Sequence, residues 1–240
     1  MIKFFRKIRQ NLLSEGKTTK YFKYAIGEIV LVVIGILIAL QINNWNEERK
    51  EKESLNAIYN LVISDLESDL KTIPEILKYN SNKAPLLKHI IKGNLSRNDY
   101  NTNDTYYNLI GGSEDFSLKT KGYEQLRNFN DNDFSSDELQ IKINDFYELY
   151  HKRIQGLNEL TLEDLKSNYN YWKENFNWYP DYLIGEESEG FIAYSINNMD
   201  YKNRVANYFF LNCGLLTEEL EEVEVEANKI LSLLKERNNQ

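Results

Sequence analysis

The sequence predicts an all-α protein in which a single N-terminal transmembrane helix leads into an extracytoplasmic bundle of three to four long helices. Three observations predict this fold class. An almost purely apolar run occupies residues 25–42. Only 3 Pro and 11 Gly interrupt the 240 residues. Downstream of residue 50, apolar residues recur at steps of three and four, which is the spacing of one helix face.

The apolar run fits a membrane-spanning helix in length, composition and flanking charge. Its 18 residues would form about 27 Å of helix, close to the thickness of a hydrocarbon core. Residues 1–24 carry a net charge of +6, although the whole chain carries −8. Because basic flanks stay in the cytoplasm, the N-terminus is predicted to lie there. The predicted parts are a basic cytoplasmic amphipathic segment at 1–23, a transmembrane helix at 24–43 and a periplasmic helical bundle domain at 44–240.

Two other interpretations of the apolar run remain open. A buried core helix of a soluble protein would not need the charge step that flanks this run. A cleaved signal peptide needs small residues at its cleavage site, whereas Leu40-Gln41-Ile42 is bulky. The basic segment itself could be an amphipathic helix in the membrane interface or a frayed tail.

Four residues in or beside the span are candidate membrane or partner contacts. Glu28 is ionisable, and its carboxylate could reach the cytoplasmic interface or contact a partner helix. Gly35 and Ala39 form a small-xxx-small pair, which permits close helix packing. Trp45 follows the span at its outer boundary, where interfacial aromatic residues belong.

The outer domain shows four helical segments. An apolar stripe runs from Leu55 to Leu77, and a polar loop is predicted at 94–117. A short helix is predicted at 119–128. A capping box of Ser135 and Glu138 then begins a long helix that ends near residue 175.

The last segment has the most regular pattern. Its apolar residues alternate steps of three and four over about four heptads, which predicts a seam for helix packing. The pattern leaves open whether this seam closes within one chain or between chains. The seam residues are Ala206, Phe209, Cys213, Leu216, Leu220, Val223, Ala227, Ile230 and Leu234.

Aromatic residues crowd the end of the predicted long helix. If the first helix leaves the membrane, the helix ending near residue 175 should return toward it, and the following loop would lie near the outer leaflet. Trp172, Trp178 and Tyr179 are therefore membrane-interface candidates. The same residues would equally suit a bundle core, a partner contact or a ligand site.

The stretch from Tyr24 to Glu47, YAIGEIVLVVIGILIALQINNWNE, follows a basic FFRKIR segment at 4–9. This combination resembles the uncharacterised single-pass membrane proteins common in Bacteroidota. Tyr123-Glu124-Gln125-Leu126 is similar to a Y-x-x-L segment of that family. The resemblance implies a single-pass anchor in the bacterial inner membrane and a helical outer domain. It implies no activity.

The composition excludes several function classes. A pI near 5.0 argues against a general nucleic-acid binder. The single cysteine, Cys213, excludes an intramolecular disulfide framework. Glu148 and His151 form an E-x-x-H pair, but His89 lacks the matching glutamate that a di-iron bundle site requires. The glutamates between 218 and 226 are predicted to form a solvated helix face. We therefore expect no enzyme activity, no cofactor and no metal.

The sequence predicts an interaction or accessory subunit. Its expected partners are the lipid bilayer and either another protein or further copies of the chain. The alternative is a periplasmic ligand-binding or sensor module, because helical bundles can hold ligands between their helices.

Overall fold

The computed structural model describes residues 6, 10, 18–129 and 138–238. Every regular element in these residues is a helix, which confirms the predicted fold class. The chain divides into two compact units, Met1–Leu55 and Asn56–Gln240. Ser135 of the predicted capping box, and most of the predicted basic segment at 1–23, lie outside the described residues.

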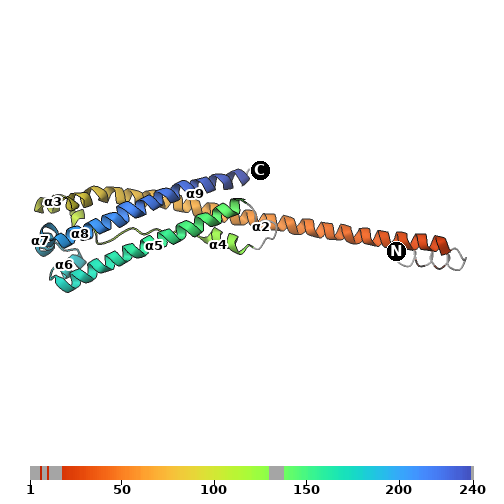
Figure 1. Cartoon of the computed structure of the whole chain (residues 1–240), viewed down its shortest axis with the longest axis horizontal. Helices are drawn as coiled ribbons and strands as arrows, with labels where there is room; N and C mark the ends of the chain where they lie inside the picture. The colour runs from red at the N-terminus through yellow and green to blue at the C-terminus, as the bar shows by residue number, and fades with distance from the viewer. Residues whose placement is uncertain (1–5, 7–9, 11–17, 130–137, 239–240) are drawn as a thin grey trace. The chain divides into compact units, whose positions relative to one another are not determined.

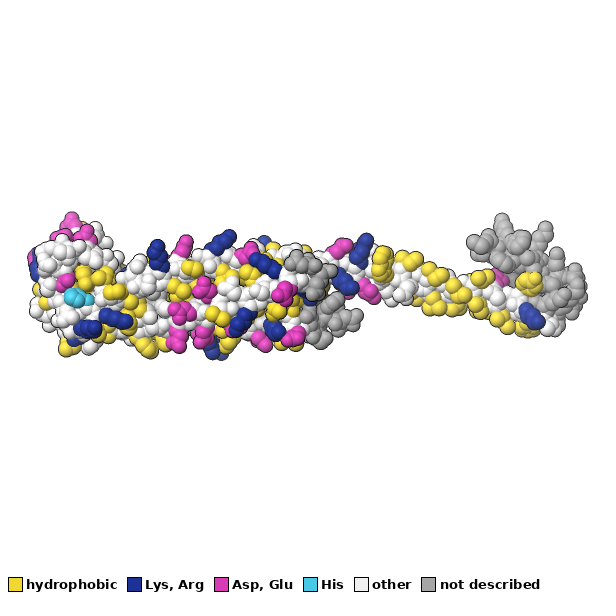
Figure 2. All heavy atoms as spheres, turned by 90° about the horizontal axis from the view of Figure 1, so that it is seen from above, with side chains coloured by type: hydrophobic (Ala, Val, Ile, Leu, Met, Phe, Trp, Pro, Cys, Tyr) yellow, Lys and Arg dark blue, Asp and Glu magenta, His cyan; other side chains and the backbone are white. Residues whose placement is uncertain are grey.

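The first unit contains the predicted apolar helix. Helix α2 begins at Thr18 and ends at Ile91, so it contributes to both units. Its large apolar side chains between Ile26 and Ile42 are 46–63% exposed, and Figure 2 shows them covering the visible face of this stretch. In the described part of the chain, α2 is the one helix long and apolar enough to cross a membrane. A buried core helix would be covered by protein, and this stretch is not.

The second unit is built on three long helices, which Figure 1 shows side by side. They are the later part of α2, helix α5 (Glu138–Asn175) and helix α9 (Thr217–Asn238). Each helix buries one apolar stripe against the other two, as an amphipathic helix must. Buried members of these stripes include Tyr59, Val62, Leu66 and Ile73 of α2, Ile143, Phe146 and Ile154 of α5, and Leu220, Val223 and Leu234 of α9.

The stripe of α2 continues differently from the prediction. Beyond Leu66, the predicted Leu70 and Leu77 are only half-buried, whereas Asp69, Asn80 and Lys83 are buried. These three polar residues continue the alternation of three and four steps that defines a packed seam. The prediction missed them because it followed apolar residues alone. Their burial is possible because each finds hydrogen-bond partners within the unit.

The predicted direction of the long middle helix is wrong. Near the start of the second unit, the carboxylate of Asp65 accepts the Gly122 N–H at 2.6 Å, and Tyr123 stacks on Tyr147 of α5. Toward the end of α2, its Lys83 donates to the Gly112 carbonyl. Tyr169 of α5 donates to the adjacent Gly111 carbonyl. Helix α5 therefore runs in the same direction as α2 and does not return.

An extended segment at 113–120 explains this arrangement. It runs back along the bundle before helix α4 (Lys121–Asn128), and it buries Phe116 and Leu118. Extended chain covers up to about 3.5 Å per residue, so a few residues recross much of the helical bundle. The prediction treated 94–117 as one end loop, although it also holds the short helices α3 (Arg97–Thr102) and η1 (Asp104–Asn108).

Helix α9 runs antiparallel to both other long helices. Lys235 pairs with Glu67 at 2.7 Å, whereas Thr217 accepts a hydrogen bond from Asn80 at 3.3 Å. The predicted seam from Leu216 onward is buried within the chain. The seam therefore closes intramolecularly, which settles one alternative that the sequence left open.

A π-helical segment, η2 (Phe209–Leu216), joins helix α8 (Met199–Tyr208) to α9. Bonds from i to i+5 insert a residue into the helical repeat and rotate the following side chains. Before this segment, the buried residues are Tyr201, Val205 and Tyr208. The predicted seam residues Ala206, Phe209 and Cys213 are only half-buried. The prediction assumed one constant heptad repeat, which cannot include this change in the buried face of the helix.

Candidate functional site: a groove between helices α5 and α9

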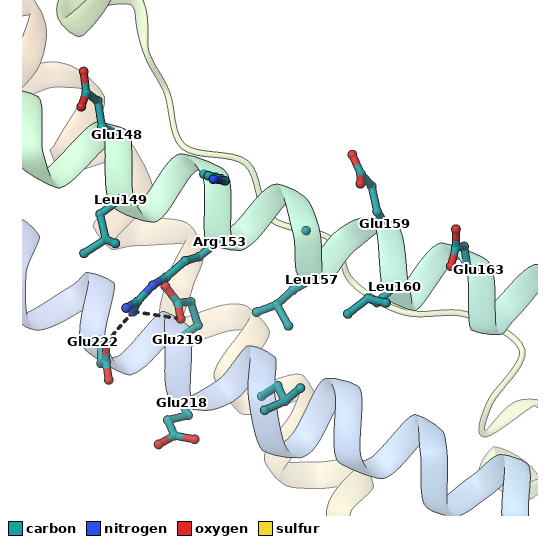
Figure 3. A pocket seen from close by; sticks show the side chains of 13 residues that line it. Glu148, Leu149, Arg153, Leu157, Glu159, Leu160, Glu163, Glu218, Glu219 and Glu222 are labelled. Atoms are coloured by element: carbon teal, nitrogen blue, oxygen red, sulfur yellow. Dashed lines mark hydrogen bonds and ion pairs between the residues drawn. The ribbon is translucent and has the colours of Figure 1, made fainter.

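A groove of about 930 Å³ lies on the surface of the second unit between α5 and the helical stretch η2–α9. Its floor is apolar. Leu149, Leu157 and Leu160 extend from α5 toward α9, as Figure 3 shows, and Leu215 contributes from the other side. Leu149 and Leu160 are 44% and 49% exposed. Leucine side chains exposed together in a concave surface are typical of a binding groove.

Gly156 keeps the middle of the groove open. A side-chain carbon built at this position would have no neighbour within 4 Å, so the helix surface is bare there. Glycine inside a helix costs about 1 kcal/mol relative to alanine. This cost is accepted at a position that lines the groove.

One cation bridges the two sides of the groove. The guanidinium of Arg153 reaches from α5 to Glu219 and Glu222 of α9, at 3.6 and 3.4 Å, as Figure 3 shows. The side chain of Glu219 is 13% exposed. Burial raises the pKa of this carboxyl above its usual range, although Arg153 opposes the effect. The pair links the two helices across a partly covered, acidic surface.

The groove is strongly acidic around its apolar floor. Its lining includes six glutamates and the two basic residues Lys152 and Arg153, which gives a net charge of −4. This excess of one sign creates a negative potential along the groove. The six glutamates are Glu148, Glu159, Glu163, Glu218, Glu219 and Glu222.

The groove continues toward the beginning of α5. A second hollow of about 420 Å³ shares Leu149 with it and is lined by Phe146, Ile230 and Leu233. The two hollows follow each other along two antiparallel helices. A depression of this shape accommodates another helix, because side-chain ridges of one helix pack into the grooves of its neighbours.

This site could be predicted from the sequence only in part. The acidic run between 218 and 226 was predicted as a solvated face, and three of its glutamates line the groove. Leu149 and Leu160 were missed because they lie outside the main stripe of α5. Their separation of 11 residues is about three helical turns, so the two leucines lie on one face. This second apolar line on α5, beside its main stripe, could have indicated the groove from the sequence.

The predicted contact residues of the first unit lie on exposed helix. Trp45 is 63% exposed, and the Arg49 guanidinium lies 5.9 Å from the centre of its ring. Gly35 would have open space around an added side-chain carbon, and Ala39 is exposed. Glu28 is partly exposed. Their role as membrane or partner contacts stays a prediction.

The aromatic candidates gather at the end of the second unit where α2 ends. Trp172 is fully buried and donates its indole N–H to Tyr194 at 3.1 Å, while Trp178 is 6% exposed. Tyr179 is partly buried against the same cluster. These three residues belong to a core, which is one of the roles that the sequence left open.

The predicted E-x-x-H pair is not part of a metal cluster in the described residues. Glu148 lines the groove, and His151 is exposed on α5. Among residues 18–129 and 138–238, no group of three or more His, Cys, Asp or Glu side chains could hold a metal ion.

A family model described as a family of unknown function (DUF6090) matches residues 28–177. The chain belongs to this family. The DUF6090 match confirms the predicted membership of an uncharacterised family. It covers most of the apolar helix and continues through α5, so it includes one side of the groove. No curated protein and no solved structure matches the chain.

Proposed function

We propose that this protein is a membrane-anchored interaction module, in which the groove between α5 and α9 binds a basic amphipathic helix of a partner protein. The observation that carries the proposal is the combination of exposed leucines with an acidic lining in one groove. An amphipathic helix that lays its apolar face into such a groove is a recurring mode of recognition.

The charge of the groove favours a basic partner over a second copy of this chain. The lining carries six glutamates and two basic side chains. Lys and Arg on the edges of a bound helix would complement this surface, whereas neutral or acidic edges would not. Two copies that met groove to groove would bring like charges together. A homo-oligomer that pairs groove to groove is therefore disfavoured electrostatically.

The proposed location follows from the first unit and its flanking charge. The exposed apolar stretch of α2 would span the inner membrane of a bacterium once, with the basic residues before it in the cytoplasm. The second unit would then lie in the periplasm. Fusions of a phosphatase or a fluorescent protein to the C-terminus test this orientation, since each is active on only one side of the membrane.

Site-specific photo-cross-linking in cells tests the groove directly. A photoreactive residue at Leu160 lies in the groove, whereas the same residue at Leu162 provides a matched control. Leu162 lies on the same helix, is 48% exposed compared with 49% for Leu160, and does not line the groove. We expect position 160, and not position 162, to link to a helical segment rich in Lys and Arg.

Two outcomes would contradict this proposal. Equal cross-linking yields at both positions would show that the groove is no preferred contact. Cross-links from position 160 to a second copy of this chain alone would replace the partner protein with a homo-oligomer.

A further inference from the structure

A second cavity lies at the end of the second unit where α2 ends, away from the groove. It has a volume of about 440 Å³, which is within the range of small-molecule sites. Four aromatic rings line it, from Tyr107, Tyr169, Tyr182 and Phe191. They come from four separate elements: η1, α5, α6 (Tyr179–Ile184) and α7 (Glu189–Asn197).

Hydrogen bonds within the protein fix the tyrosine rings in place. The Tyr169 hydroxyl donates to the Gly111 carbonyl at 2.7 Å, and the Tyr182 hydroxyl donates to the Asn108 side-chain oxygen at 2.9 Å. Gly111 is required for this approach, because a side-chain carbon there would lie 1.8 Å from the Asn108 oxygen. The hydroxyl protons are thus used within the protein. Phe191 is buried behind the lining, whereas the rings of Tyr107 and Tyr182 keep part of their surface exposed.

Burial raises the pKa of both Tyr169 and Tyr182 above the ordinary value of 10.0. Both phenols are therefore neutral at physiological pH. Neutral aromatic rings attract cations through the negative potential of their faces.

Carboxylates surround the same cavity. Asp104, Glu186 and Glu187 line it, and none of its described lining residues is Lys, Arg or His. Arg97, on the neighbouring α3, pairs with Glu189, and its charge also acts on Glu187 and Tyr107. Gly185 ends α6 in the left-handed region at φ 76°, and this turn leads directly into the acidic residues at 186 and 187. Three negative charges beside fixed aromatic rings favour a cationic ligand.

We propose that this cavity binds a small organic ammonium compound, held beside the partly exposed rings of Tyr107 and Tyr182 and neutralised by the carboxylates of Asp104, Glu186 and Glu187. A bare metal ion is a poorer match, because the described residues form no cluster of three ligating side chains. This site is independent of the groove, so either proposal can fail without the other.

Choline titrated into the full-length protein in mild detergent tests the site. Tryptophan fluorescence reports binding, because the rings of Trp172 and Trp178 lie 5.3 and 6.0 Å from Tyr182. The alcohol 3,3-dimethylbutan-1-ol has nearly the shape of choline without the charge. We expect saturable binding of choline and markedly weaker binding of the alcohol.

Three variants locate the binding. Tyr107→Leu should weaken choline binding by about threefold to thirtyfold, which is the range of one cation–π contact. Glu186→Gln is a surface change and should weaken it by about twofold to fivefold. Glu174→Gln is the matched control, because Glu174 is exposed at the end of α5 and does not line the cavity. It should leave the affinity unchanged.

The proposal is overturned by equal binding of choline and the neutral alcohol, or by no saturable response to choline at about 10 mM, where even a very weak site would be occupied. Equal weakening in Glu186→Gln and Glu174→Gln would also overturn it, because general surface charge would then explain the binding. If Tyr107→Leu fails to fold, the two glutamate variants still decide the question.

Discussion

Replacing Asp69 by Asn should stabilise the folded protein at neutral pH. Asp69 is 1% exposed, and its carboxylate accepts the Lys119 N–H at 3.0 Å. Burial raises the pKa of this carboxyl from 3.8 to about 7, although the hydrogen bond from Lys119 opposes the effect. The nearby carboxylate of Asp65 raises the pKa further. The native protein therefore holds a proton that the unfolded chain has already released.

The sign and size follow from this difference in pKa. Because the pKa of Asp69 is higher in the folded state, protonation of this carboxyl favours folding. This stabilisation is fully present below about pH 4 and is lost as the pH rises through about 7. A shift from 3.8 to about 7 corresponds to about 4 kcal/mol of differential stability. Solvent screening near the exposed Lys119 reduces the expected value to about 2–3 kcal/mol. Asparagine mimics the neutral acid and keeps an acceptor for the Lys119 N–H.

Urea unfolding of both proteins, followed by the fluorescence of the buried Trp172 and Trp178, measures this effect between about pH 4.5 and pH 7.5. The free energy of unfolding of Asp69→Asn should exceed that of the natural protein by an amount that grows with pH. Glu75→Gln, on an exposed position of α2, provides the control for a simple change of charge. If the free energy of unfolding changed with pH in the same way for both proteins, the reasoning would be refuted. Asp69 would then not be buried beneath the segment at 113–120.

Three further predictions concern single residues of the second unit. Burial lowers the pKa of Lys83 from 10.5 to about 8, so the unfolded chain binds this proton more tightly. Stability should therefore rise between about pH 8 and pH 10, and Lys83→Met should abolish that rise in urea unfolding. At Gly122, an added carbon would lie 2.4 Å from the Val62 nitrogen, so Gly122→Ala should destabilise the protein by about 3 kcal/mol. Gly156→Ala, in open space within α5, should instead stabilise it by about 1 kcal/mol in the same assay.

The sequence predicted the helices well and their arrangement only in part. Apolar periodicity identified α5 to its last turn near residue 175 and the seam of α9 from Leu216 onward. It could not predict that the seam of α2 continues through Asp69, Asn80 and Lys83. Their partners, such as the Asn212 carbonyl that accepts from Asn80 at 2.9 Å, are distant in sequence. Local pattern carries no information about such pairs.

The candidate sites depend on exposure and on contacts between elements, which the sequence shows only weakly. The groove needs Leu149 and Leu160 to remain exposed, and apolar residues on a helix are expected by default to be buried. The cavity needs Tyr107, Tyr182 and Phe191 to line one space, although they belong to three short helices. The aromatic content predicted a cluster near residues 172–179, but not that it would border a cavity with acidic residues.

The family match and the structure together define what the fold requires. The match ends within the loop after α5, at residue 177. A chain ending there would leave Phe146, Tyr150 and Ile154 without the covering seam of α9, and all three are at most 7% exposed in the folded protein. Burying such side chains contributes about 1.5–3 kcal/mol each. Helix α9 is therefore needed for the stability of the region that the family model matches in this protein, and it also supplies Glu218, Glu219 and Glu222 to the groove. Because the same helix closes the core and forms one side of the groove, the groove exists only when the bundle is complete.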